Sequence, residues 1–222
     1  MKAGPVPLRI LEVYSVNILC YGDSNTYGLT TDWKGRLPRD VRWPGRLQML
    51  LGADHYVLED GLIGRTCAIP DYHRYGRSAM DFLPVALEVH APLDYLILAF
   101  GTNDCKAEKV RTVQEAAQGM EELVLLAQRL APHTRILIVA AAPLRECVLD
   151  VDPDFDALSV EISAQLWKEY QKIAERFGCL FLNAGDVANT SDADGEHLDE
   201  KGHAALAEAV ARILLEDMKG RT

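Results

Sequence analysis

Residues 16–28 read Val-Asn-Ile-Leu-Cys-Tyr-Gly-Asp-Ser-Asn-Thr-Tyr-Gly. The apolar run that ends at Tyr21 changes abruptly into small and polar residues. This change is typical of a central strand that delivers its chain to a site at its carboxyl end. Ser24 is the residue to explain, because a serine after a strand serves either as a nucleophile or as the cap of the next helix.

Four more short apolar runs follow, each too short for a buried helix. They are residues 56–58, 95–100, 136–140 and 179–182. The runs 95–100 and 136–140 are continuous rather than alternating, which is typical of strands that are covered on both faces. The runs therefore predict five strands, of which at least two are central.

The segments between the runs have a helical period instead. Residues 113–130 place their apolar side chains on one face, and Thr112 with Glu115 forms a capping-box signature before them. A second helix over 162–177 is followed by Gly178 at a carboxyl-cap position, and a third runs from about 199 to 215. Alternating strands and helices predict a three-layer α/β/α fold around a five-stranded parallel sheet.

The 222 residues most simply form a single domain, 1–222, in which residues 1–15 are an N-terminal extension. The net charge of −10 removes the electrostatic basis for binding nucleic acid or an anionic membrane, so we expect neither partner. Polar and proline residues interrupt the apolar part of the N terminus, and no apolar run approaches the roughly 18 residues of a membrane span. We expect a cytoplasmic protein.

The five cysteines are scattered, odd in number and never spaced as C-x-x-C. This distribution predicts neither a disulfide framework nor a zinc site. We expect no metal and no cofactor.

Polar residues follow four of the five predicted strands. They occupy positions 22–25, 60–66, 101–104 and 192–197. In a parallel sheet these loops emerge at the same edge, where open α/β folds bind their ligands. Residues that are distant in sequence are therefore predicted to converge there.

Acyl transfer is the chemistry that these residue types support. A serine hydroxyl needs a base, and a neutral imidazole serves when a carboxylate fixes its tautomer, so Ser24, His197 and Asp194 form a candidate triad. The attacked carbonyl also develops an oxyanion that needs hydrogen-bond donors. The backbone N–H groups of Ser24 and Gly64 and the side-chain amide of Asn103 are candidates for these donors.

Four blocks of this sequence resemble those of the SGNH hydrolases, also called the GDSL esterase/lipase family, in order and in spacing. The blocks are Gly22–Gly28, Gly61–Thr66, Gly101–Asp104 and Asp194–His197, and the resemblance extends over nearly the whole chain. It implies a flavodoxin-like SGNH hydrolase fold, and it is strongest toward short-chain arylesterase and acetylesterase members. It also implies the same triad and oxyanion residues as the chemistry above. Of the two glycines in the second block we choose Gly64, because Gly61 is placed to turn the chain as it leaves its strand.

One departure is that Asn25 replaces the leucine of the GDSL name. Two alternatives to an esterase stay open. The first is a catalytically silent member that binds an acylated sugar or a protein, and the second is a phosphatase-like enzyme that uses Asp23. The second alternative lacks the further aspartate of a phosphatase loop, and Thr26 stands one residue early, so we interpret Asp23 as structural.

The loop 29–43 directly follows the nucleophile and is expected to line or cover the substrate pocket. Aromatic and apolar residues of this loop and of its neighbours can enclose a methyl group or a ring. The candidate pocket residues are Trp33 and Trp43 in this loop, Tyr27 before it, and Ile63 and Arg65 after the second predicted strand. Packing of Trp43 on the next helix is an equally weighted alternative. We expect a small-molecule ester with a short acyl chain as the substrate.

Two insert-like stretches, 71–78 and 145–155, combine the look of exposed loops with apolar side chains. These side chains are Tyr72, Tyr75, Val148, Leu149 and Phe155. Exposed apolar patches are common at subunit contacts, so we expect a homo-oligomer.

Overall fold

Five parallel strands form one sheet, in the order β2-β1-β3-β4-β5. The computed structural model describes residues 16–71 and 74–221, so the expected N-terminal extension lies outside the described residues. The strands are β1 (Val16–Gly22), β2 (His55–Gly61), β3 (Tyr95–Phe100), β4 (Arg135–Ala140) and β5 (Leu180–Asn183). Each lies at one of the five apolar runs, and the prediction of a five-stranded parallel sheet is confirmed.

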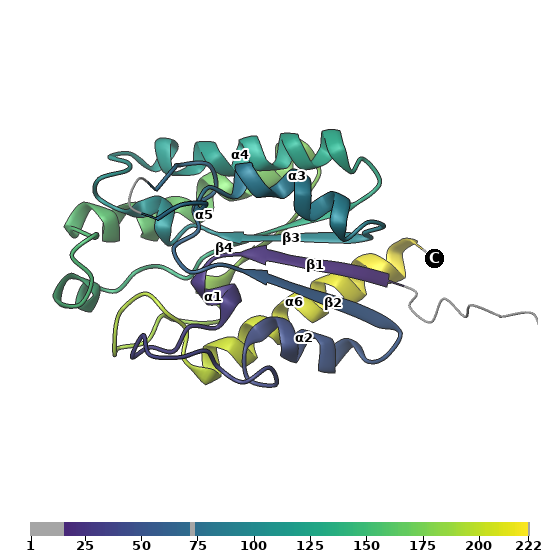
Figure 1. Cartoon of the computed structure of the whole chain (residues 1–222), viewed down its shortest axis with the longest axis horizontal. Coiled ribbons are helices and arrows are strands. Elements are labelled where there is room, and N and C mark those ends of the chain that lie inside the picture. Colours follow the sequence, from purple (N-terminus) through teal and green to yellow (C-terminus); the bar gives the residue numbers. More distant parts are fainter. Residues whose placement is uncertain (1–15, 72–73, 222) are drawn as a thin grey trace, which may run out of the picture.

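Helices cover both faces of the sheet, as Figure 1 shows. The α-helices are α1 (Ser24–Tyr27), α2 (Trp43–Leu51), α3 (Ala79–Val89), α4 (Val113–Leu130), α5 (Ala157–Phe177) and α6 (Glu200–Arg221). Helices α3, α4 and α5 pack on one face, and α2 and α6 pack on the other. The predicted three-layer α/β/α architecture is therefore confirmed.

Two of the predicted helix ends are also present, whereas α6 continues to Arg221, beyond the predicted end at about 215. Thr112 and Glu115 make both hydrogen bonds of a capping box at the start of α4. Helix α5 ends at Gly178, whose φ of 67° is in the left-handed region that glycine tolerates best.

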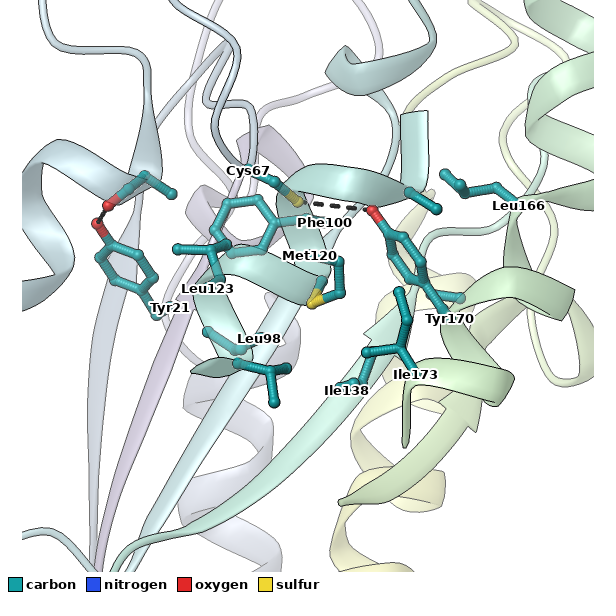
Figure 2. Close-up of a cluster of buried hydrophobic side chains, with 14 of the residues drawn as sticks. Tyr21, Cys67, Leu98, Phe100, Met120, Leu123, Ile138, Leu166, Tyr170 and Ile173 are labelled. Atoms are coloured by element: carbon teal, nitrogen blue, oxygen red, sulfur yellow. Dashed lines mark hydrogen bonds between the residues drawn. The ribbon is translucent and has the colours of Figure 1, made fainter. Parts of the chain in front are cut away.

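Side chains of β3 alternate between two cores. All six of its residues are buried, with Leu98 on the side of α3, α4 and α5 and Ile97 on the side of α2 and α6. Figure 2 shows the first core, where the Sγ of Cys67 lies 3.5 Å from the hydroxyl of Tyr170. Burial on both faces explains why β3 is continuously apolar.

The carboxyl ends of the strands are level with one another. Gly22, the last residue of β1, is in register with Gly61 at the end of β2 and with Ala99 near the end of β3. In Figure 1 the loops that follow these strands gather with α1 at one end of the sheet. This is the edge at which the sequence predicts the site.

One expectation about the surface is partly wrong. The stretch 145–155 contains a short 3-10 helix, Glu146–Asp150, and it buries Val148 and Phe155 in the core with α5. Removing apolar side chains from water in this way lowers the free energy of the folded protein. Leu149 stays 41% exposed and Tyr75 is 99% exposed, while Tyr72 lies outside the described residues.

Within residues 16–71 and 74–221, no helix has the length and apolar character needed to cross a membrane.

Candidate active site

Ser24 is the first residue of α1, directly after β1, and its side chain is buried. The cap of this short helix is Asp23, whose carboxylate accepts a hydrogen bond of 2.9 Å from the backbone N–H of Asn25. Asp23 therefore has the structural role expected for it. The hydroxyl of Ser24 is not the cap and is left for another partner.

That partner is His197. Its Nε2 lies 3.0 Å from the Oγ of Ser24, and its Nδ1 lies 2.7 Å from the Oδ2 of Asp194. When Asp194 accepts the Nδ1 proton, Nε2 is left to accept the proton of the Ser24 hydroxyl. All three side chains are buried, so the structure brings together the three residues of the candidate triad.

The turn that carries Asp194 and His197 keeps the carboxylate in a fixed orientation. The Oδ1 of Asp194 accepts hydrogen bonds from the backbone N–H groups of Glu196 and His197, at 3.2 and 3.1 Å. Burial opposes ionisation of Asp194, but the hydrogen bonds from His197 and from these N–H groups outweigh it and lower the pKa of its carboxyl. Asp194 is therefore a carboxylate at neutral pH.

His197 has a raised pKa for a related reason. Burial disfavours the imidazolium, yet the hydrogen bond to Asp194 and the nearby charges of Glu196 and Asp23 outweigh it and raise the pKa of the ring. A base whose conjugate acid is stabilised in this way suits proton transfer near neutral pH.

Glu196 is a further acidic residue at the triad, and no sequence pattern had singled it out. Its Oε1 lies 3.6 Å from the Nδ1 of His197, and its side chain is buried. Burial, with the charges of Asp152 and Asp194, raises the pKa of Glu196 to about 7, although His197 and Lys106 act in the opposite direction. Its position in Asp-Gly-Glu-His was visible in the sequence, but its burial was not.

Asn103 and Asp104 hold the loop that carries Gly64. The side-chain amide of Asn103 donates to the carbonyl of Arg65 at 3.2 Å, and the Oδ1 of Asp104 accepts from the backbone N–H of Cys67 at 2.8 Å. One N–H of the Asn103 amide remains for another acceptor, because a primary amide has two. The loops after β2 and β3 are thus joined next to the nucleophile loop.

Gly64 can be replaced only with strain. Its φ of 76° lies in the left-handed region, and a Cβ at this position would stand 2.2 Å from the Nη2 of Arg74. The guanidinium of Arg74 therefore lies directly against the backbone of the candidate oxyanion residue. Arg74 also pairs with Asp71 at 3.2 Å, and nothing in the sequence pattern had pointed to it.

Asn25 fastens the nucleophile loop to the histidine loop. Its amide nitrogen donates to the carbonyl of Glu196 at 3.2 Å, and its amide oxygen accepts from the backbone N–H of Leu198 at 2.9 Å. A leucine at this position could make neither bond. The departure from the GDSL pattern therefore has a structural purpose in this chain.

Trp33 reaches the triad itself. Its indole N–H donates to the Oδ2 of Asp194 at 3.2 Å, and its ring meets the ring of His197 edge-on, with centroids 5.7 Å apart. Tyr27, the last residue of α1, and Ile63, on the loop after β2, are both half-buried, and the guanidinium of Arg36 covers the ring of Tyr27 at 4.3 Å. These three pocket candidates belong to the segments around the nucleophile.

Trp43 does not line the pocket, and this part of the prediction is wrong. The residue is fully buried where α2 packs against α6, and its backbone N–H donates to the Nδ1 of His203 at 3.2 Å. Burial next to the positive charge of His197 lowers the pKa of His203 to about 4, so His203 is a neutral acceptor. Packing rather than pocket lining is correct for Trp43, but Trp43 begins the next helix, α2, and packs against α6.

Arg65 also points inward rather than toward a substrate. Its Nη1 donates to the carbonyls of Gly22 and Asp60, at 3.0 and 2.7 Å, and its Nη2 donates to the Oδ1 of Asp60 at 2.9 Å. The guanidinium lies over the ring of Tyr21, 4.3 Å from its centroid. Arg65 therefore links the ends of β1 and β2 through hydrogen bonds.

One group of potential metal ligands occurs within the described ranges. The donor atoms of Asp194, Glu196 and His197 lie within 4.8 Å of one another. The Nδ1 of His197 is already bonded to Asp194, and Glu196 directly precedes His197 on the same turn, so this hydrogen bond and the turn account for the proximity of the three groups.

Comparison with known proteins places the chain in one family. Residues 20–205 match the GDSL-like Lipase/Acylhydrolase family. An acetylxylan esterase of Xylanibacter ruminicola is 25% identical over 96% of this chain, and the chain spans 45% of the length of that relative.

Two solved structures are similar over nearly their full length. A carbohydrate acetylesterase family member from Sinorhizobium meliloti is 36% identical, with a TM-score of 0.85 over 90% of this chain and 97% of that one. An aryl esterase of M. smegmatis is 32% identical, with a TM-score of 0.84 over 91% of this chain and 99% of that one. The chain belongs to the GDSL-like lipase/acylhydrolase family, the SGNH hydrolases.

Proposed function

We propose that this protein is a serine esterase that hydrolyses short-chain, acetyl-like acyl esters of small molecules or sugars through an acyl-enzyme. The observation that carries the proposal is the continuous chain of hydrogen bonds from Ser24 through His197 to Asp194. The family supports the same reaction class, and the names of the relatives support an acetyl group.

In the proposed reaction the Oγ of Ser24 attacks the ester carbonyl, and its proton passes to the Nε2 of His197. The N–H groups of Ser24 and Gly64 and the amide of Asn103 donate to the resulting oxyanion. The intermediate collapses as His197 returns the proton to the departing alkoxide, and an alcohol leaves. Water then attacks the acyl-enzyme, again with His197 as the base, and releases the carboxylic acid.

Asp194 keeps its charge throughout the proposed cycle. Its hydrogen bonds hold the imidazole in the required tautomer and stabilise the imidazolium that forms in each half-reaction. Transfer of the acyl group to an alcohol instead of water is the corresponding side reaction.

The two alternatives have less support. The carboxylate of Asp23 is buried and caps α1, so it is poorly placed to attack a phosphate. A silent binding protein would have no need for the aligned hydroxyl, imidazole and carboxylate.

An acyl-chain series of 4-nitrophenyl esters tests the proposal, with Ser24→Ala as the blank. We expect kcat/KM to peak at roughly two to four carbons and then to fall, because each further methylene contributes about 0.8 kcal/mol only while the pocket can bury it. Efficiency that still rises at eight carbons contradicts the short-chain assignment. A rate in the wild type no higher than in Ser24→Ala contradicts the esterase assignment.

A further inference from the structure

Trp33 lies at the tip of a tight turn in the loop after the nucleophile. Leu29 and Arg36 form an antiparallel bridge at the base of the turn, and the backbone N–H of Thr30 donates to the carbonyl of Gly35 at 3.0 Å. The N–H of Trp33 donates to the carbonyl of Thr30 at 2.8 Å. These bonds fix the backbone of Trp33.

The backbone of Trp33 is strained. Its φ is 61°, and among the described residues it is the one non-glycine position with a positive φ. Glycine or asparagine suits this conformation, whereas a bulky side chain is an outlier there. Backbone strain of this kind persists at sites where the side chain has a function.

The turn itself does not require an indole. The polar groups of the turn bond to one another: the carboxylate of Asp32 accepts hydrogen bonds from the hydroxyl of Thr30 at 2.6 Å and from the N–H of Lys34 at 3.1 Å. Trp33 has no such local hydrogen bond from its side chain, and the side chain is 44% exposed. The reason for tryptophan at this position has to be sought outside the turn.

The contacts of the indole are with two residues of the triad. Its N–H donates to Oδ2 of Asp194, the same oxygen that accepts from Nδ1 of His197. Its ring stands nearly perpendicular to the imidazole, at 88°, so it limits rotation of that ring. One side chain thus touches both the carboxylate and the base.

A second donor on Oδ2 also has an electrostatic effect. A hydrogen bond to a carboxylate stabilises its charged form and reduces its attraction for a neighbouring proton. Removing the indole N–H therefore strengthens the interaction of Asp194 with the His197 imidazolium. The other ionisable groups that face His197 are Glu196 on the same loop, Asp23 after β1 and His203 on α6.

We propose that Trp33 is a positioning residue of the triad: from a strained turn it fixes the Asp194 carboxylate and the His197 ring and moderates the basicity of the pair. The proposal rests on the proposed esterase function. It assigns Trp33 a role beyond that of a pocket wall.

Trp33→Phe is the informative variant, because it keeps an aromatic ring at this position while it removes the N–H donor together with one ring of the indole. We expect kcat to fall about tenfold while KM for 4-nitrophenyl acetate changes less than twofold. We also expect the acid limb of the kcat/KM profile to move to higher pH by roughly half a unit. Lys34→Ala, a change at an exposed residue of the same turn, is the matched control and should alter neither quantity.

A double-mutant cycle that combines Trp33→Phe with Asp194→Asn separates a positioning role of Trp33 from a general loss of structure. If Trp33 acts through Asp194, Trp33→Phe should cost less than twofold in the Asp194→Asn background. A full tenfold loss in that background overturns the proposal, as does an acid limb that stays in place in the single variant. A change confined to KM also overturns it, because it would make Trp33 a substrate contact. Failure of the esterase function itself is seen separately, as equal rates in the wild type and in Ser24→Ala.

Discussion

The Nε2 of His197 lies 3.0 Å from the Oγ of Ser24, although 173 positions separate the two residues in the chain. The parallel sheet brings them together, because the loops after β1 and β5 leave it at the same edge. Asn25 completes the arrangement by bonding directly to the backbone on both sides of His197.

Replacing Asp194 by asparagine should leave the fold intact and reduce kcat by a factor on the order of 10⁴. The amide presents a donor where His197 needs an acceptor, so the imidazole takes the wrong tautomer. Steady-state kinetics together with far-UV circular dichroism checks this. A folded Asp194→Asn variant within tenfold of the wild-type rate would remove Asp194 from the triad.

Replacing Asn103 by alanine should lower kcat by roughly 10²–10³ and leave KM nearly unchanged, because an oxyanion donor acts mainly in the transition state. Thr102→Val, at the neighbouring buried position, is the control and should keep near-wild-type kinetics. A change in KM alone would make Asn103 a residue that binds substrate.

Glu196→Gln should move the acid limb of the kcat/KM profile to lower pH. The carboxylate of Glu196 lies near the Nδ1 of His197 and helps to raise the pKa of that ring, so its removal lets the pKa fall. The exposed Glu200→Gln is the control. An acid limb that does not move would show that Glu196 stays protonated over the pH range of the assay.

The same variant tests the sign of a stability effect. Glu196 has a pKa of about 7 in the folded protein, against 4.5 ordinarily. Between these values the native state holds a proton that the unfolded chain has released, so stability falls as pH rises through the window. The melting temperature of Glu196→Gln relative to wild type should therefore increase from pH 5 to pH 8, and a constant difference would contradict this.

The chain should form a homo-oligomer. Phe82, Val85 and Val89 are exposed on α3, and Tyr75 is exposed on the loop before it. Together they form an apolar surface of a kind often found in subunit contacts. Light scattering at micromolar concentration should give a mass above 24.6 kDa that Val85→Glu lowers, and a monomer mass for the wild type would refute the prediction.

Much of the fold could be read from local sequence signals. Continuous apolar runs such as 95–100 mark strands that are buried on both sides, and the capping pair of Thr112 with Glu115 marks where α4 begins. The four polar blocks follow strands of one parallel sheet, so their convergence could also be predicted.

The details of the site depended on contacts that no local pattern contains. Arg65 points inward because it satisfies carbonyls at the ends of two strands, and Trp43 is buried because α6 packs over it. Neither orientation is fixed by composition or spacing. The contact of Trp33 with Asp194 requires a strained turn that is equally invisible in the sequence.

Covalent trapping of the nucleophile is the decisive experiment for the role of Ser24. The protein is treated with an organophosphonate ester that reacts with activated serines, and the modified peptide is identified by mass spectrometry. We expect one adduct per chain, on Ser24, together with loss of esterase activity, no adduct in Ser24→Ala and slow labelling in His197→Ala. An adduct at another residue, or full turnover by Ser24→Ala, would show that Ser24 is not the nucleophile.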